Sequence, residues 1–153
     1  MLTERGDRVL SKTQSRPEDD GFTLIELLVV MIIIGILAAI AIPVFLSQRT
    51  KAQDSATKAD VSKVGKEIAT YFVDATVVPT IALTAGRYTL TPTAGAAQDL
   101  GVASANVSVM TSNVVDSTHW CVALSNSTAN TKVWKYSARG GLAQNDCTAA
   151  DVA

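Results

Sequence analysis

The residues best suited to chemistry lie in the short stretch Gly21–Phe22–Thr23–Leu24–Ile25–Glu26. Glu26 is the only charged residue between Gly21 and Gln48. A carboxylate near the centre of a membrane span costs about 2.5–3.5 kcal/mol, so its presence in this apolar run needs an explanation. No Lys, Arg or His lies within one helical turn of it. Cleavage between Gly21 and Phe22 would supply a cation, because Phe22 would then carry an α-amino group one turn from Glu26.

Two interpretations of Glu26 stay open on the residues alone. In the first, Glu26 lies near the end of the apolar run, and its carboxylate reaches the membrane surface without a special task. In the second, the carboxylate pairs with a Phe22 amine, either in the same chain or in another chain of an apolar helix bundle.

The remaining sequence holds no catalytic or metal-binding pattern. His119 is the only histidine and has no Cys, His or Asp constellation around it. Asn145, Asp146 and Asp151 could offer oxygens to Ca²⁺, but they are few and of types common in turns. We therefore predict no enzyme activity, no metal site and no cofactor.

Size and charge favour one small domain with an anchor. The chain has 153 residues, a formal net charge of -1 and 48% hydrophobic residues. It lacks the strongly basic balance that is typical of nucleic-acid-binding proteins. A local contact with DNA is compatible with this charge, but no feature of the sequence supports it.

The N-terminal half predicts one long helix after a polar leader. Residues 1–20 are polar and lack an apolar period. The segment from Leu27 to Gln48 contains no charged residue. As a helix, it is long enough to span a hydrocarbon layer of about 30 Å. Pro43 removes a backbone donor and favours a kink. Beyond Arg49, apolar residues recur at helical spacing and predict a stripe that packs on a partner; these residues are Ala56, Val61, Val64, Ile68 and Phe72.

The C-terminal half predicts a small antiparallel sheet. The run VVPTIALTAG (77–86) is interpreted as a loop or short connection. Short runs rich in Val, Tyr, Trp and Thr predict three or four strands; they are RYTLT, NVSVM, HWCVALS and KVWKYSA. Ser127–Asn130 predicts a hairpin connection between the last two. The apolar stripe of the helix would cover one face of this sheet.

The two cysteines, Cys121 and Cys147, predict a disulfide if this part of the chain is exported. Closing such a loop stabilises the fold by about 3.5 kcal/mol in the chain-entropy model.

The stretch GFTLIELLVVMIIIGILAAIAIP, from Gly21 to Pro43, resembles the prepilin N-terminus of type IV pilins and the related pseudopilins. The likeness consists of a glycine before an aromatic residue, the run Thr23–Glu26, the long apolar segment and the proline. It covers residues 21–46 closely and the amphipathic helix to about Val73 in general style. It does not extend to the C-terminal domain.

The resemblance implies a sequence of processing steps. A prepilin peptidase at the cytoplasmic membrane face would cut between Gly21 and Phe22 and N-methylate Phe22. Glu26 would then register an incoming subunit through the Phe22 amine of a neighbour. In the filament, the helix would lose regularity between Gly35 and Pro43, and Gly and Pro are the two poorest helix formers.

The expected architecture is a pilin-like α+β fold, in which the second half of a long helix packs on a small antiparallel sheet. Its expected parts are a cytoplasmic leader (1–21, removed), an apolar transmembrane and filament-core helix (22–46), an amphipathic continuation (47–75) and a β-rich head (76–153).

The expected function is that of a type IV pilus subunit. It would span the cytoplasmic membrane once before assembly and belong to an extracellular pilus afterwards. Its expected partners are other pilin copies, a prepilin peptidase and the assembly machinery of the cytoplasmic membrane, with no small-molecule substrate.

Three alternatives remain. The first is a pseudopilin of a type II secretion or competence system, against which Cys121 and Cys147 speak because pseudopilins often lack a C-terminal disulfide. The second is a soluble secreted domain that begins at Ile42 after an ordinary signal peptide. The third is a single-pass anchored surface protein that never assembles.

Overall fold

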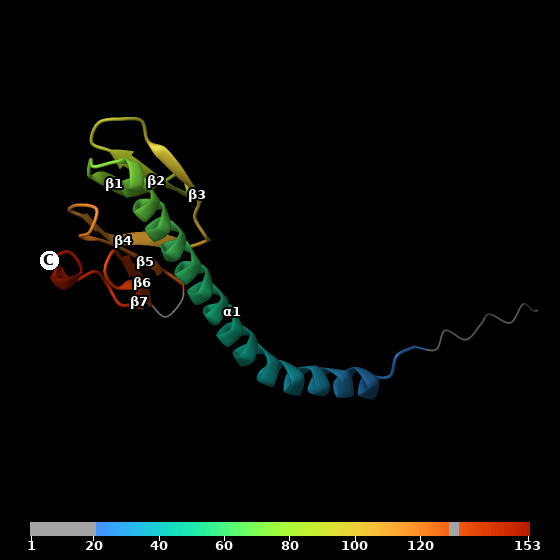
Figure 1. The fold of residues 1–153 in the computed structure, drawn as a ribbon. Coiled ribbons are helices and arrows are strands. Elements are labelled where there is room, and N and C mark those ends of the chain that lie inside the picture. Colours follow the sequence, from blue (N-terminus) through green and yellow to red (C-terminus); the bar gives the residue numbers. More distant parts are fainter. Residues whose placement is uncertain (1–20, 129–131) are drawn as a thin grey trace, which may run out of the picture. The chain divides into compact units, whose positions relative to one another are not determined.

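The computed structural model describes residues 21–128 and 132–153. The chain divides into two compact units after Ile40, and one helix, α1 (Leu24–Asp74), contributes residues to both (Figure 1). Apart from Gly21, the predicted leader lies outside the described residues.

Helix α1 continues through the two residues expected to disturb it, Gly35 and Pro43. Beyond the proline, helix-unfavourable hydroxyl residues bond back to the preceding turn. The Thr50 hydroxyl donates to the Leu46 carbonyl at 3.0 Å, and the Ser62 hydroxyl donates to the Lys58 carbonyl at 2.8 Å. These bonds satisfy the polar groups within the helix itself.

The residues after α1 form two antiparallel sheets. The first contains β1 (Pro79–Thr84), β2 (Arg87–Pro92) and β3 (Gln98–Val102), in that order. The second contains β4 (Val107–Val114), β5 (Trp120–Asn126), β6 (Val133–Ser137) and β7 (Gly141–Gln144), also in chain order. A short 3₁₀ helix, η1 (Ala149–Asp151), follows.

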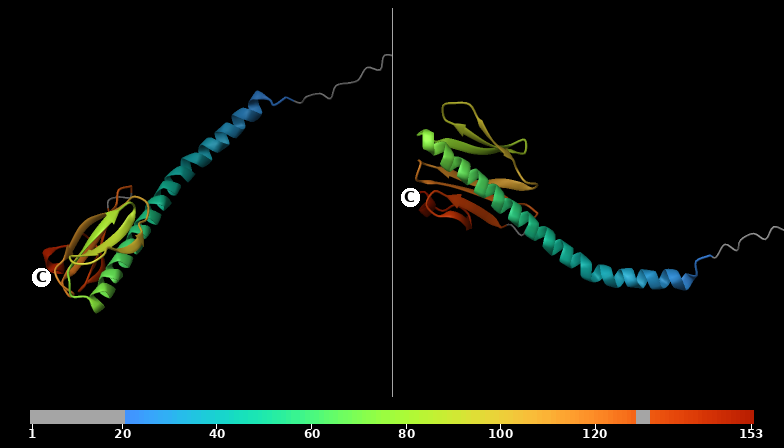
Figure 2. Two further views of the ribbon diagram at one scale, coloured as in Figure 1. Left: turned by 90° about the horizontal axis from the view of Figure 1, so that it is seen from above. Right: turned by 45° about the vertical axis from the view of Figure 1, so that its right-hand side comes forward.

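The core lies between the second half of α1 and these sheets, as Figure 2 shows for residues 41–153. Val61, Val64 and Ile68 of α1 are fully buried. They join one cluster with buried residues from both sheets; these are Ile81, Tyr88, Leu90, Leu100, Val107, Trp120, Val122 and Leu124. The apolar stripe predicted from the sequence is therefore confirmed as the face of α1 that packs on the sheets.

The second sheet is covered on its other face as well, because every residue of β5 is buried. Trp120, Val122 and Leu124 face the helix, so the alternating residues Cys121 and Ala123 face away from it. The C-terminal segment covers this second face through the disulfide between Cys121 and Cys147. An ion pair between Lys135, the β6 partner of Ala123, and Asp151 holds the same segment further along.

The predicted α+β fold is confirmed, but the predicted strands are incomplete. Residues 77–86, interpreted as a loop, contain β1, and β3 and β7 were not predicted. The sequence pattern did not indicate β1 because Pro79 and Gly86 are residue types that commonly interrupt strands. Pro79 instead starts an edge strand, where a missing N–H is tolerated. Gly86 (φ 74) and Ala85 (φ 49) form the tight turn into β2.

The hairpin predicted at Ser127–Asn130 lies partly outside the described residues. The strands on either side of it, β5 and β6, are antiparallel neighbours as expected.

Candidate functional site

The segment that carries the predicted processing and registration residues is the start of α1. Phe22 lies just before the helix and is 85% exposed. Phe22 and Glu26 line one shallow hollow on the helix surface, together with Ile25, Val29 and Val30. The structure therefore brings the predicted amine-bearing residue and the predicted carboxylate to the same face.

In the uncut chain Glu26 is engaged by Thr23. The Thr23 backbone N–H and hydroxyl donate to Glu26 Oε2 at 2.9 and 2.8 Å. In return, the Glu26 backbone N–H donates to the Thr23 hydroxyl at 3.3 Å. This reciprocal arrangement is a capping box, which satisfies backbone donors that a helix N-terminus leaves free.

The role of Thr23 was missed in the sequence. The signal was nevertheless present, because Thr-Leu-Ile-Glu has the spacing of a capping box before an apolar run. The carboxylate thus has a local task in the single chain, and this task does not need a cation.

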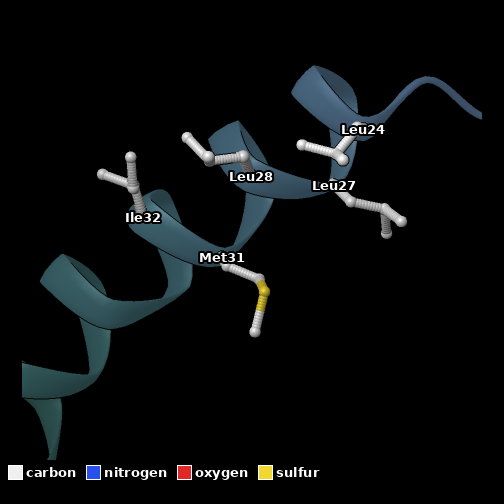
Figure 3. A pocket seen from close by; sticks show the side chains of 5 residues that line it. All are labelled: Leu24, Leu27, Leu28, Met31 and Ile32. Carbon is white, nitrogen blue, oxygen red and sulfur yellow. The ribbon is translucent and has the colours of Figure 1, made fainter.

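The apolar side chains beyond Glu26 lie bare on the helix. A second shallow hollow is lined by Leu24, Leu27, Leu28, Met31 and Ile32, whose side chains project from the ribbon in Figure 3. Large apolar residues remain exposed as far as Leu46. In length and composition this helix is sufficient to cross a membrane. Exposure of such a large apolar surface to water is unfavourable. Lipid or other protein must therefore cover it.

Gly35 and Pro43 both belong to the helix in this structure. No atom outside the helix backbone lies within 4 Å of the position that a Cβ on Gly35 would take. A loss of helical regularity at these two residues in a filament stays a prediction.

Cys121 and Cys147 are joined by a disulfide, with their Cα atoms 5.9 Å apart. The bond closes a loop with a sequence separation of 26 residues. It ties the C-terminal segment to the central strand β5 and leaves no free cysteine among the described residues.

Three acidic side chains join the C-terminal part to α1 or to itself, and no sequence pattern indicated these contacts. Asp60 accepts hydrogen bonds from Tyr88 and Ser104. Asp54 accepts one from the indole N–H of Trp134 at 2.6 Å and pairs with Lys132. Asp151 pairs with Lys135 at 2.7 Å. The partners in these contacts are separated by up to 80 residues in the sequence, so no local pattern predicts them.

The other polar candidates have structural positions. His119 Nδ1 lies 2.8 Å from Asp116 Oδ2 in a turn. Hydrogen bonds from the Thr118 backbone and from His119 hold the pKa of Asp116 well below its usual range. Asp151, considered for Ca²⁺, is occupied by Lys135 and Thr148. Over residues 21–128 and 132–153, no group of three or more His, Cys, Asp or Glu could hold a metal ion.

Comparison with known proteins identifies the same N-terminal region. Residues 18–42 match the family described as "Prokaryotic N-terminal methylation motif". The chain is 37% identical over 59 residues to "Type II secretion system core protein G" of Pseudomonas aeruginosa, which covers 39% of this chain and 42% of the relative. No solved structure matches the chain significantly.

Two pilins are also similar. The "Type IV major pilin protein PilA" of Myxococcus xanthus is 51% identical over 45 residues, covering 29% of this chain and 20% of the relative. The "Type IV narrow pilus major component PilA5" of Thermus thermophilus is 43% identical over 60 residues, covering 39% and 52%. The chain thus spans between a fifth and about half of the length of these relatives.

The methylation motif, the long apolar helix and the relatives make the N-terminal part of the chain similar to the family of type IV pilins and type II pseudopilins. Proteins of this family are structural and non-enzymatic. The matched parts are similar to members of both branches.

Proposed function

We infer that the chain is the structural subunit of a type IV pilus. The observation that carries this proposal is the bare apolar surface of α1 from Leu24 to Leu46, with a single carboxylate at its start. A lone membrane anchor needs only lipid around it. When other helices cover this surface, the capping box with Thr23 leaves the charge of Glu26 unpaired, and another subunit can supply the cation.

Processing would occur between Gly21 and Phe22, followed by N-methylation of Phe22. Both residues are exposed and precede the helix, so the bond between them is accessible to a peptidase. The family match, which spans residues 18–42, supports this position.

Glu26 would register subunits through the new amine. Cleavage leaves Thr23 in place, so the capping box persists in the mature chain. A carboxylate has about four acceptor sites, and Thr23 uses one oxygen, Oε2, so Oε1 remains free for the methylated amine of a neighbour. A subunit that slips along the bundle would leave Glu26 unpaired in apolar surroundings, which disfavours wrong registers.

Before assembly, the apolar segment would span the cytoplasmic membrane, and afterwards it would form the filament core. Lipid is as apolar as the helix, so the apolar segment can leave the membrane for the filament only if neighbouring helices bury the same surface. The partners are further copies of the chain, the prepilin peptidase and the assembly machinery in the cytoplasmic membrane.

A type II pseudopilin is the second candidate, and one observation favours it. The chain is 37% identical over 60 residues to "Type II secretion system core protein G" of Vibrio cholerae as well as to the Pseudomonas protein. The disulfide between Cys121 and Cys147 supports the pilin instead, because pseudopilins often lack one there.

The deciding experiment is intact-mass and N-terminal peptide analysis of material sheared from the cell surface. A pilin predicts a chain that begins at N-methylated Phe22 and is two hydrogens light. Recovery of the same processed chain from the cell envelope only, with none in the sheared fraction, would favour the pseudopilin. A chain that begins at Ile42 would contradict both candidates.

A further inference from the structure

Four charged residues in the second half of α1 share a regular spacing. Lys51 and Lys58 are seven residues apart, and so are Glu67 and Asp74. Seven residues make about two turns, so the members of each pair lie on the same side of the helix. Lys58 and Glu67 are nine residues apart, about two and a half turns, so the basic pair and the acidic pair lie on opposite sides.

The acidic pair lines a polar hollow. Glu67 and Asp74 border it together with Thr70, Tyr71, Ala75 and the first residue of β3, Gln98. The Tyr71 hydroxyl is held by the Val77 carbonyl at 2.9 Å, so this side of the hollow is fixed. We call it the acidic hollow; it offers two carboxylates to an incoming ammonium group.

Among the residues that the structure describes, neither carboxylate takes part in an ion pair. The last turn of α1 contains no basic residue, and Asp74 lies at the end of the helix where a negative charge is unfavourable. Among the described residues, the ion pairs join Arg87 with Asp99, His119 with Asp116, Lys132 with Asp54 and Lys135 with Asp151. Both carboxylates are therefore available to a cation from another chain.

The basic pair is similarly available. Lys51 is exposed and joins none of these ion pairs. The ammonium of Lys58 lies 5.0 Å from the centre of the Trp134 ring, and Lys58 joins none of these ion pairs either. Lys58 is also exposed.

We propose that Lys51 and Lys58 of one copy of this chain pair with Glu67 and Asp74 of a second, parallel copy. Both pairs have the same offset of sixteen residues, from 51 to 67 and from 58 to 74. One axial shift of about 24 Å between parallel helices therefore brings both pairs into contact at once. The basic and acidic pairs lie on opposite sides of the helix. Each copy can therefore contact one neighbour through its lysines and a second neighbour through its carboxylates.

A contact between two different sides of the same chain does not close on itself. It repeats from copy to copy and generates an open helical polymer, whereas a contact between identical sides would stop at a dimer. This inference rests on the proposed function as a filament subunit and adds a second register to that of Glu26. Lys51, Lys58 and Asp74 are exposed and Glu67 is partly buried. The pairs therefore contribute to direction and specificity, and salt screens them.

The first test uses charge reversal in cells that express the full chain. Lys51→Glu and Glu67→Lys should each lower the sheared polymer per cell by roughly fivefold, the upper range for one exposed pair. The double variant Lys51→Glu/Glu67→Lys should recover most of the wild-type yield. Lys66→Glu, a reversal at an exposed lysine on a different side of α1, is the matched control and should have little effect.

A second test captures the contact directly and does not depend on polymer yield. Cells that coexpress Lys58→Cys and Asp74→Cys chains should form a disulfide-linked dimer between the two variants. Coexpressed Lys66→Cys and Asp74→Cys chains should form much less of it.

The outcomes separate the two proposals. Three results would overturn this inference alone, provided that the wild type forms polymer. They are normal polymer yield from the single reversals, no recovery of yield in the double variant, and equal cross-linking of the control pair. A wild-type chain that is never sheared off as polymer overturns the proposed function and the paired helices with it.

Discussion

The buried hydroxyl of Tyr88 on β2 donates a 3.0 Å hydrogen bond to Oδ2 of Asp60 on α1. The same carboxylate accepts the Ser104 backbone N–H at 2.7 Å and the Ser104 hydroxyl at 3.0 Å. Asp60 therefore joins the helix to β2 and to the segment before β4 at one point. Burial, followed by the charge and the hydrogen bond of Asp60, raises the pKa of Tyr88 well above its ordinary value, so its hydroxyl stays a donor.

Asp60→Ala should lower the free energy of unfolding by about 2–4 kcal/mol, because it leaves the donors of Tyr88 and Ser104 without an acceptor. Tyr88→Phe should lower it by only about 1–2 kcal/mol, because Ser104 still satisfies the carboxylate. Urea unfolding of the detergent-solubilised chain, followed by tryptophan fluorescence, measures both. Equal effects of the two substitutions would contradict this role of Asp60.

Gly65→Ala should destabilise the fold, although alanine is the better helix former by about 1 kcal/mol. Gly65 is buried on the packed face of α1, and an added Cβ would lie 2.7 Å from the Tyr136 Cβ and overlap its ring. We expect a net loss of about 1–3 kcal/mol, as in other overpacked cores. Gly35→Ala is the control, since open space surrounds it, and it should leave the unfolding of the β-rich part unchanged.

Removal of the disulfide by Cys121→Ala/Cys147→Ala should lower the stability by about 3.5 kcal/mol, given the loop of 26 residues that it closes. In a thermal melt, the wild type should lose at least about 10 °C on reduction. The double variant should melt at the same temperature with and without reductant. A wild type insensitive to reductant would show that the ion pair of Asp151 and the β-strand packing hold the C-terminal segment unaided.

Acid should weaken the hold on this C-terminal segment. Burial opposes ionisation of Asp151, but the hydrogen bonds from Lys135 and Thr148 outweigh it and lower its pKa to about 2. A carboxyl with a depressed pKa stabilises the fold fully above its unfolded pKa of about 3.9, and this contribution disappears as the pH falls through the folded value. In unfolding experiments, the wild type should lose stability between pH 5 and pH 2. The variant Asp151→Asn should be less stable than the wild type at pH 7 and should lose less stability over the same pH range.

Glu26 has a charge and a capping role, and substitutions separate them. Glu26→Gln keeps an acceptor for Thr23 but removes the charge, so membrane insertion should continue while sheared polymer falls at least about tenfold. Thr23→Ala removes the hydroxyl from the capping box and should reduce the polymer far less. Immunoblots of membrane and sheared fractions measure both, and normal polymer from Glu26→Gln would rule out pairing of the charged carboxylate with an amine.

The structure of the N-terminal half could be predicted from short-range sequence patterns. An uncharged apolar run needs no knowledge of distant residues to be recognised as a helix fit for a membrane. The buried stripe of Val61, Val64 and Ile68 follows from helical spacing alone. The same holds for the placement of Phe22 and Glu26 on one face, because a helix returns to that face every fourth residue.

The β-rich half was predicted less completely because its strands are short and its turns share residues with loops. Pro79 and Gly86 have the composition of a connection, yet pairing with β2 makes residues 79–84 a strand. The alternation in β5 predicted one buried face, whereas the C-terminal segment buries the other as well. A strand's second partner cannot be inferred from its own residues.

By itself, the sequence determined the long helix and the apolar run with its lone carboxylate, and it predicted the pairing of the two cysteines if this part of the chain is exported. Only the tertiary structure decided that there are two sheets, that Asp60 and Asp54 anchor α1 to β2 and β6, and that the acidic hollow forms beside Gln98. Helical order depends on residues one turn apart, which a sequence displays directly. These other features depend on residues that come together only when the sheets pack on the helix.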